Sequence, residues 1–190
     1  LLTPDKERTM NTYLGANRLY SEDDVIEKSV EEADLFYFTG YMWDTETQQK
    51  SVMKALEICK RMGKKIAFDV ADPFAVGRYR QTFHNIISQY CDIVFANSEE
   101  ARFLMDNYDP YECCKSLGKL CPIAIVKNGK KGSFISENKV ITQISTYGEA
   151  TPVDTTGAGD TYAAGFLYGY LTGHSSVESC NIASYLAGRI

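Results

Sequence analysis

The sequence predicts an α/β fold with a mostly parallel central sheet. Short apolar segments typical of buried strands alternate with longer segments of helical periodicity between residues 35 and 126. Strands and helices that alternate at this interval form right-handed βαβ units, in which the strands are parallel. The 190 residues contain no internal repeat, linker or low-complexity segment, so we expect one domain or most of one.

The expected elements follow one another in a regular order. A strand over 8–14 and a helix that begins at Ser21 precede the alternating region. That region is expected to contain strands 35–38, 64–70, 93–96 and 123–126, and helices 45–62, 76–90, one capped by Ser98, and 111–117. Gly63 follows the first long helix and is expected to terminate it. An antiparallel hairpin is expected next, with strands 132–136 and 139–144 and a turn at 137–138. Two further helices are expected to begin near Asp160 and Ser175.

Composition and charge argue against several classes of function. With 44% hydrophobic and 24% charged residues, the chain is typical of a globular protein. The net charge of −5 and the absence of any Lys or Arg run longer than a pair argue against nucleic-acid partners and anionic membrane surfaces. No apolar segment approaches about 18 residues and the first residues do not resemble a signal peptide, so we expect a cytoplasmic protein without a membrane partner. Nothing in the sequence specifies an oligomeric state.

The six cysteines and two histidines form no recognisable metal or catalytic motif. The cysteines are not spaced as C-x-x-C, and they do not alternate with histidine as zinc ligands do. We therefore expect reduced, structural thiols; the adjacent Cys113 and Cys114 leave open the alternative of an exposed redox pair. No Ser or Cys nucleophile motif lies near either histidine, which argues against a hydrolase triad.

The most informative segment is 154–160, Asp-Thr-Thr-Gly-Ala-Gly-Asp. Gly157 and Gly159 let the backbone approach a ligand closely, and the helix that follows begins with N–H groups that lack intrahelical partners and carry partial positive charge. Such a helix start binds anions. Asp160 would accept a proton from an alcohol that attacks a bound phosphate, so the segment predicts phosphoryl transfer. The alternative is a plain tight turn with an Asp that only stabilises the helix start.

The helix after this segment is expected to pack very closely against another element. Gly165 and Gly169 each lower helix stability by about 1 kcal/mol relative to Ala, so a close neighbour is needed to explain them. Spacing excludes two common nucleotide motifs. No segment matches G-x-x-x-x-G-K-[ST], and after Gly157 and Gly159 the next glycine is Gly165, so G-x-G-x-x-G is not formed either.

Polar turns follow two of the expected strands. Asn97-Ser98-Glu99-Glu100 follows the strand 93–96, and the segment 127–132, Lys-Asn-Gly-Lys-Lys-Gly, follows the strand 123–126. Ligands of open α/β sheets gather at the carboxyl ends of the strands, so we expect these turns to converge with 157–160. The alternatives are an N-cap at Ser98 with acidic residues in the first helical turn, and a plain turn at 127–132.

Together these segments resemble the PfkB, or ribokinase-like, family of carbohydrate and nucleoside kinases. Residues 154–160 with Ala163-Ala164-Gly165-Phe166 match the C-terminal signature of that family, which is highly specific. Asn97-x-x-Glu100 resembles its N-x-x-E element, and 127–132 resembles its nucleotide-binding G-x-x-G turn, although many members carry Thr where Lys127 stands. The resemblance implies a three-layer α/β/α sandwich that uses ATP and magnesium.

The resemblance also implies roles for the matching residues. Asp160 would be the general base that takes the proton from the acceptor hydroxyl. The anion hole for the transferred γ-phosphoryl would consist of the backbone N–H groups of Gly157, Ala158 and Gly159. Magnesium would be arranged, through water, by Asn97 and Glu100. The nucleotide would contact Lys127, Gly129 and Gly132. Some members bind a monovalent cation, often potassium, at the positions of Asp154 and Thr156.

Within the family, residues 8–16 and Asp72-Pro73-Phe74 with Arg78 and Arg80 are most similar to bacterial adenosine kinases and adenosine kinase-like sugar kinases. The resemblance makes residues 1–190 most of one kinase domain, from which the N-terminal acceptor motif, most of the small β lid and the extreme C-terminus are missing. We therefore expect ATP-dependent phosphorylation of a primary hydroxyl on a sugar or nucleoside, with adenosine favoured over ribose-type or fructose-type sugars.

The position of the nucleotide follows from the position of its γ-phosphate. If that phosphate reaches 157–160, the base is expected between the turn after Val126 and the helices that begin near Asp160 and Ser175. Asn181, Ala183 and Ser184 would then lie near the base, or they form an ordinary helix face. Two other functions stay open: a catalytically silent nucleotide- or nucleoside-binding protein on the same fold, and a flavodoxin-like or Rossmann protein, which lacks support because its phosphate loop is absent.

Overall fold

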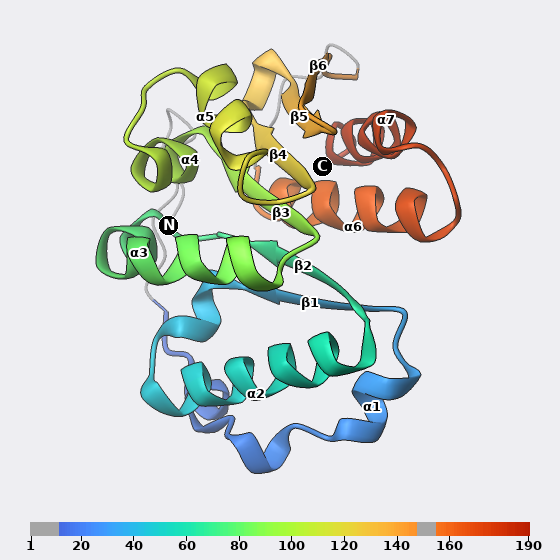
Figure 1. Ribbon diagram of the computed structural model, residues 1–190. Coiled ribbons are helices and arrows are strands. Elements are labelled where there is room, and N and C mark those ends of the chain that lie inside the picture. Colours follow the sequence, from blue (N-terminus) through green and yellow to red (C-terminus); the bar gives the residue numbers. More distant parts are fainter. Residues whose placement is uncertain (1–11, 148–154) are drawn as a thin grey trace.

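A single six-stranded sheet forms the centre of the molecule (Figure 1). The computed structural model describes residues 12–147 and 155–190. The strands lie side by side in the order in which they occur in the sequence, and the first four are parallel while the last two are antiparallel. Their bounds are β1 Leu35–Thr39, β2 Lys65–Asp69, β3 Ile93–Asn97, β4 Ile123–Lys127, β5 Ser133–Glu137 and β6 Val140–Ile144.

Helices cover both faces of this sheet, as the three-layer expectation requires (Figure 1). On one face lie α2 Glu46–Met62, α3 Pro73–Tyr90, α4 Ser98–Met105 and α5 Pro110–Leu117. On the other lie α6 Ala158–Leu171 and α7 Ser176–Ala187. The short α1, Glu27–Glu32, precedes β1. The predicted α/β/α sandwich with a mostly parallel sheet is therefore confirmed.

Alternation along the strands divides the core into two parts. Ile66 and Phe68 of β2 pack under α2 to α5, whereas Ala67, between them, packs on the side of α6 and α7. Because successive side chains of a strand point to opposite faces, Asp69 shares the face of Ala67. The same rule places the final residues of β3 and β4, two positions after Phe95 and Ile125, on the α6 side. The sheet thus presents three polar side chains to the N-terminus of α6.

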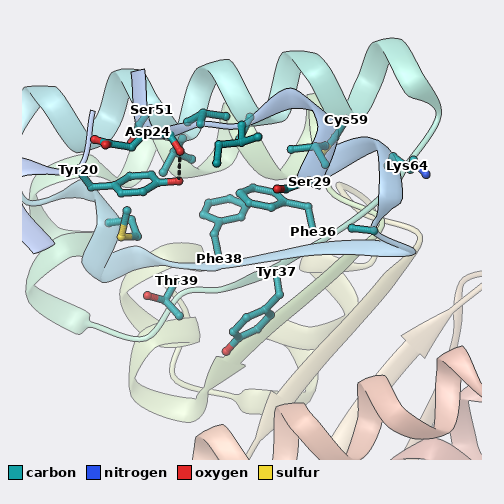
Figure 2. A pocket seen from close by; sticks show the side chains of 17 residues that line it. Tyr20, Asp24, Ser29, Phe36, Tyr37, Phe38, Thr39, Ser51, Cys59 and Lys64 are labelled. Atoms are coloured by element: carbon teal, nitrogen blue, oxygen red, sulfur yellow. Dashed lines mark hydrogen bonds between the residues drawn. The ribbon is translucent and has the colours of Figure 1, made fainter. Parts of the chain in front are cut away.

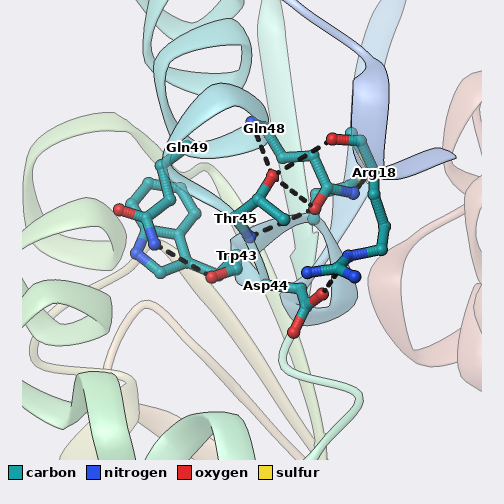
Figure 3. A network of polar contacts seen from close by, with 7 residues as sticks. Arg18, Trp43, Asp44, Thr45, Gln48 and Gln49 are labelled. Carbon is teal, nitrogen blue, oxygen red and sulfur yellow. Dashed lines mark hydrogen bonds and ion pairs between the residues drawn. The ribbon is translucent and has the colours of Figure 1, made fainter. Parts of the chain in front are cut away.

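A polar network fixes the start of α2 (Figure 3). Thr45 and Gln48 form a capping box, in which the Gln48 N–H donates to the Thr45 hydroxyl and the Thr45 N–H donates to the Gln48 side chain. The Thr45 hydroxyl also donates to the carbonyl of Arg18 at 3.3 Å, and the Arg18 guanidinium lies 3.2 Å from Asp44. These contacts hold the segment before α1 against α2. At its other end α2 stops at Gly63, with φ 65°, as predicted.

The N-terminal part differs from the expectation for 8–14 and for Ser21. Residues 8–11 lie outside the described residues, 12–14 are irregular, and a 3₁₀ helix, η1 Gly15–Leu19, follows. Ser21 does cap a helical turn, because its hydroxyl and backbone N–H both donate to Asp24, but the turn is the short 3₁₀ helix η2, Glu22–Asp24. Residues 12–14 therefore do not form the predicted strand, and the rest of that prediction lies outside the described residues.

Two helices begin earlier than predicted, at prolines. Asp72 caps α3 by accepting from the Phe74 N–H at 2.9 Å, and Asp109 caps α5 by accepting from the Tyr111 N–H at 2.9 Å. Proline follows each Asp as the first helical residue, where its missing N–H removes no intrahelical bond. The predicted starts at residues 76 and 111 were therefore late, because hydrophobic periodicity does not register the Asp-Pro capping signal that begins each helix.

The β5–β6 hairpin turns at Asn138 and Lys139, one residue later than predicted. Both residues have positive φ, 51° and 66°. This combination gives the turn a twist that matches the right-handed twist of the strands. The hairpin extends the parallel sheet by two antiparallel strands, as the change of period after Val126 indicates.

The close packing predicted for the helix after Gly159 is confirmed. A methyl group on Gly165 would lie 2.8 Å from the Cα of Ala183, and one on Gly169 would lie 2.9 Å from the Cα of Ser179. Both neighbours belong to α7, so the two glycines allow the backbones of α6 and α7 to approach each other.

All cysteines are reduced and buried, which confirms structural thiols and excludes an exposed pair at Cys113 and Cys114. Burial raises the pKa of the Cys113 thiol to about 11 and that of Cys114 to about 12, so neither is a thiolate near neutral pH. Within residues 12–147 and 155–190, none of the helices combines the length and apolar character needed to cross a bilayer.

Candidate active site

Three polar side chains project from the carboxyl ends of neighbouring strands. Asp69, Asn97 and Lys127 are the last residues of β2, β3 and β4. Asn97 and Lys127 are direct partners in the β3–β4 register. All three lie on the face that α6 covers, so the predicted convergence of the turn at Asn97 and the turn at Lys127 with the 157–160 segment takes place at one edge of the sheet.

The N-cap of α6 is Gly157, whose φ of 82° is in the left-handed region that favours glycine. The Ala158 N–H donates to the Thr155 carbonyl at 3.1 Å, so among the expected anion-hole donors this one is engaged locally. Asp160 stands exposed in the first turn. Thr156 is exposed, and Asp154, its expected partner in binding a monovalent cation, lies outside the described residues.

Lys127 and Asp69 form a buried ion pair beside this helix start. The ammonium donates to Asp69 Oδ2 at 2.9 Å, and the two side chains are 14% and 4% exposed. A methyl group on Gly159 would lie only 3.4 Å from the ammonium nitrogen. The other oxygen of Asp69 accepts from the N–H of Ala71 at 3.2 Å, and Ala71 itself has a positive φ of 60°. Lys127 therefore places a fixed positive charge against the α6 backbone.

Asn97, rather than Ser98, is the N-cap of α4, which corrects the prediction for Ser98. The Asn97 side-chain oxygen accepts from the N–H groups of Glu99 and Glu100 at 2.9 and 2.8 Å. In return the Glu100 carboxylate accepts from the Asn97 N–H at 2.8 Å and from its side-chain amide at 2.6 Å. Burial of this carboxylate raises the pKa of Glu100 to about 7.

The Asn97–Glu100 pair fits magnesium only through intervening water. Oxygen donors are the ligands that Mg²⁺ prefers, and it keeps several waters in most protein sites. Both carboxylate oxygens of Glu100 already accept hydrogen bonds from Asn97. No group of three or more His, Cys, Asp or Glu in the described part of the chain is arranged to hold a metal ion.

The turn after β4 is built around two glycines with positive φ, Gly129 at 54° and Gly132 at 87°. Gly129–Lys131 forms a 3₁₀ helix, and the Asn128 N–H donates to the Gly132 carbonyl at 2.7 Å, which closes the turn. A methyl group on Gly132 would lie 1.9 Å from the Ile144 carbonyl oxygen. Gly132 is therefore required by packing against β6, whatever else the turn does.

The start of α7 lies at the opposite edge of the sheet from the turn after β4, and the nucleotide position between that turn, α6 and α7 stays a prediction. The Ser176 hydroxyl donates to Glu137 at 2.8 Å, and Glu137 pairs with the first residue of β4. The Ser184 hydroxyl donates to the carbonyl of Ser145, just after β6, at 2.9 Å. Because α7 runs antiparallel to α6, its C-terminal half, and not its first turn, approaches Lys127.

The residues expected near the base on α7 have different surroundings. Ala183 and Ser184 are buried between α6, α7 and the end of β6, whereas Asn181 is exposed midway along the helix. Nearer the site edge, the rings of Tyr147 and Tyr185 meet at 4.7 Å in an edge-to-face arrangement, and both are partly exposed.

Sequence reasoning missed Asp69 and Tyr37. Tyr37 projects from β1 on the face opposite to Phe36 and Phe38 (Figure 2), and it packs with the core beneath α6. Burial together with the charges of Asp69 and Asp160 raises the pKa of its hydroxyl. The available signal was an acidic residue at the end of the apolar run 66–68, because a carboxylate that ends a buried strand lies at the ligand edge.

The family model of the pfkB carbohydrate kinases matches residues 1–189. The chain belongs to the PfkB family. The glycine-rich start of α6 and the ends of β3 and β4, where the resemblance located the family motifs, are brought to one edge of the sheet.

Several PfkB relatives are similar over most of this chain. An adenosine kinase from Sinorhizobium meliloti, whose crystal structure is known, is 36% identical with a TM-score of 0.93, over 98% of this chain and 57% of its own. The 5-dehydro-2-deoxygluconokinase of Geobacillus thermodenitrificans is 28% identical over 80% of this chain and 47% of its own length. A protein described as a ribokinase II from E. coli, in complex with ATP and Mg²⁺, shares the fold at 21% identity and a TM-score of 0.80, over 90% of this chain and 56% of its own.

The chain spans about half the length of the curated relatives it matches. The substrates named for those relatives therefore support a proposal for this chain and do not establish its substrate.

Two hollows lie near β1, one beside the strand and one beyond its carboxyl end. The larger, about 560 Å³, is mainly apolar and lies between β1, α2 and residues 20–33, where Phe36 and Phe38 face it (Figure 2). It is separated from the PfkB site by β1 itself. The smaller, about 210 Å³, lies beyond the carboxyl ends of β1 and β2 and is lined in part by Asp44, Asp72 and Arg78. Its position at the ligand edge makes it the better candidate for an acceptor.

Proposed function

We propose that this protein is an ATP-dependent phosphotransferase that phosphorylates a primary hydroxyl of a sugar or nucleoside. The observation that carries the proposal is the α6 N-terminus, where Gly157 and Gly159 expose backbone beside the Lys127 ammonium, with Asp160 one residue further on. Helix dipole and ammonium together favour a phosphate at this point. A carboxylate at the same point serves an attacking alcohol.

In the proposed reaction, Asp160 accepts the proton of the acceptor hydroxyl as the hydroxyl oxygen attacks the γ-phosphorus of ATP. The bond between that phosphorus and the β,γ-bridging oxygen breaks, and ADP leaves. The N–H groups of Gly157 and Gly159 then stabilise the charge on the transferred phosphoryl, and Ala158 joins them if its N–H leaves the Thr155 carbonyl. Phosphoryl transfer needs positioning and charge stabilisation rather than covalent help from the protein, which this arrangement supplies. Magnesium, held through water by Asn97 and Glu100, would neutralise the β- and γ-phosphates.

The nucleotide is proposed to extend from Lys127 along the turn at Gly129 and Gly132 toward α7. Tyr147 and Tyr185 offer an aromatic surface near this end of α7, where a base can stack. Asn181 is proposed as a further contact, since its side chain is exposed on the same helix. We also retain potassium at Asp154 and Thr156 as a proposal.

Adenosine is proposed as the favoured acceptor, ahead of ribose-type or fructose-type sugars. The 36% identity to an adenosine kinase over 98% of the chain supports this choice. The hollow with Asp44, Asp72 and Arg78 offers polar groups that suit a hydroxyl-rich molecule. An acidic sugar is the second candidate, because relatives named 5-dehydro-2-deoxygluconokinase match the chain and Arg78 provides a positive charge.

Two measurements test the proposal and its alternative, a catalytically silent nucleotide-binding protein. Calorimetric titration with MgATP is expected to show binding, and a coupled assay with adenosine, ribose or 5-dehydro-2-deoxygluconate is expected to show turnover with adenosine. Because the chain spans about half the length of its relatives, we expect nucleotide binding to be easier to detect than turnover. Binding without turnover on any acceptor, also in a form extended to the full length of the relatives, would support the silent alternative.

A further inference from the structure

The buried pair of Asp69 and Lys127 is poorly explained by stability alone. Its two side chains are almost withdrawn from water, and the distance between them is 2.9 Å. Removing two charges from water offsets most of their attraction, so a buried ion pair contributes little compared with apolar residues of the same size. The pair joins strands that are not neighbours, since β3 lies between β2 and β4. Strands β2 and β4 are already fixed by their own ladders with β3.

The surroundings of the ammonium favour an anion. A methyl group on Gly159 would lie 3.4 Å from the Lys127 nitrogen, so the ammonium adjoins the first turn of α6. A helix N-terminus carries partial positive charge, and a cation beside it is unfavourable without a negative partner. Asp69 provides that partner at 2.9 Å. A phosphate at the helix start would meet the same ammonium, because that ammonium adjoins Gly159.

Asp69 is held in a fixed orientation, yet its carboxylate would compete with an incoming phosphate for the Lys127 ammonium. Its Oδ1 accepts from the Ala71 N–H at 3.2 Å and its Oδ2 from Lys127, so the carboxylate is oriented by backbone. Lys127 has a flexible four-carbon side chain that loses rotamer freedom when it is held. Holding it in advance directs the ammonium, but the carboxylate then shares the ammonium with any phosphate that arrives.

We propose that Asp69 is a positioning residue that holds the Lys127 ammonium at the N-terminus of α6, and that the γ-phosphate of ATP replaces it as the partner of that ammonium. The inference rests on the proposed function and extends it. It assigns selectivity for a triphosphate over a diphosphate to the Asp69–Lys127 pair, because only the γ-phosphate reaches the helix start.

The test is a double-mutant cycle measured by calorimetric titration with MgATP and MgADP. Asp69→Asn is expected to tighten ATP binding about tenfold, because the γ-phosphate no longer competes with a carboxylate for the Lys127 ammonium. The gain corresponds to the free energy of one charge-assisted hydrogen bond. ADP affinity is expected to stay within about twofold of the wild type, since a diphosphate lacks the group that takes the place of Asp69. Lys127→Met is expected to weaken ATP binding about tenfold or more and to leave ADP binding unchanged.

In the Lys127→Met background, Asp69→Asn is expected to have no further effect on ATP affinity, since Asp69 acts only through Lys127. Lys127→Arg keeps a positive donor and is expected to retain part of the ATP preference. Asp92→Asn is the matched control, because Asp92 pairs with Lys65 at 2.7 Å at the opposite edge of the same sheet. It is expected to leave both affinities unchanged.

Weaker or unchanged ATP binding by Asp69→Asn would overturn the inference, as would an equal change for ADP or an effect that persists without Lys127. These outcomes leave the proposed function intact, because the wild type would still bind both nucleotides. If the wild type binds neither nucleotide, the proposed function and this inference both fail. Circular dichroism and urea unfolding of each variant establish that a change in affinity is not a loss of fold.

Discussion

The carboxylate of Glu100 lies 2.8 Å from the backbone nitrogen of Asn97, and the Asn97 side-chain oxygen lies 2.8 Å from the backbone nitrogen of Glu100. This reciprocal cap ties the end of β3 to the start of α4 at the candidate active site. It also buries a carboxylate, which raises the pKa of Glu100 to about 7. The pair therefore couples the local structure of the site to pH.

The stability of the protein is expected to report this coupling. Between about pH 4.5 and 7 the folded state keeps a proton on Glu100 that the unfolded state has released, so the free energy of unfolding falls as pH rises. At about 1.4 kcal/mol per pKa unit, this contribution is of the order of 3 kcal/mol across that window. Glu100→Gln is expected to lack it, which urea unfolding at pH 5 and pH 8 measures. Glu99→Gln, at an exposed position of the same helix, is the control and keeps the wild-type slope.

Asp160→Asn is expected to lower kcat by about 10²–10⁴-fold, the usual contribution of a general base, with little change in MgATP affinity. The amide keeps the shape of the side chain but cannot accept the proton of the acceptor. The measurement is the coupled assay, in whichever form of the protein shows turnover. Asp23→Asn, in the exposed turn η2, is expected to leave kcat unchanged. Near-normal turnover by the Asp160 variant would remove it from the proposed mechanism.

Gly159→Val is expected to abolish turnover without unfolding the protein. Its side chain would stand against the Lys127 ammonium, 3.4 Å from the first carbon, and would obstruct phosphate from reaching the backbone. The affinity for MgATP should also fall, which calorimetric titration measures. Gly77→Val is the matched control, because nothing lies within 4 Å of a methyl group at that helical position. A fully active Gly159 variant would contradict the anion-hole assignment.

Gly165→Ala is expected to lower the free energy of unfolding by about 1–3 kcal/mol, the usual effect of overpacking. The added methyl group would lie 2.8 Å from the Ala183 Cα and 3.1 Å from Leu186. Gly77→Ala, in open space on α3, is expected to raise stability by about 0.5–1 kcal/mol instead, because Ala is the better helix former. Urea unfolding measures the free energy of unfolding of both variants. Equal changes would show that α6 and α7 can move apart without a loss of stability.

The parts of the fold that were predictable from sequence are those set by local chemistry. Gly63 ends α2 because its left-handed conformation is available to glycine, and the strands of the parallel sheet are uninterrupted apolar runs. Ser98 was misassigned because two neighbouring residues can both cap a helix, and the choice of Asn97 depends on where β3 ends.

The site was predictable as a set of motifs but not as a geometry. Gly157 and Asp160 follow from the sequence pattern, since backbone freedom and a carboxylate at a helix start are local properties. Asp69 could not be connected with Lys127, because their contact bridges 58 positions and depends on the order of three strands. The direction of α7 was equally invisible, since it depends on how the helix docks on α6 and not on its own residues.

The two glycines that seat α7 on α6 also determine how the candidate site comes apart. The helix start that carries Asp160 belongs to a helical hairpin whose contacts are close in sequence, whereas the Lys127 ammonium and the Asp69 carboxylate belong to the parallel sheet. A hairpin of this kind can detach as one cooperative unit while the strands keep their ladders. Such a sub-global opening would carry Asp160 away from Lys127 with the sheet still folded, so activity would be lost before the protein denatures.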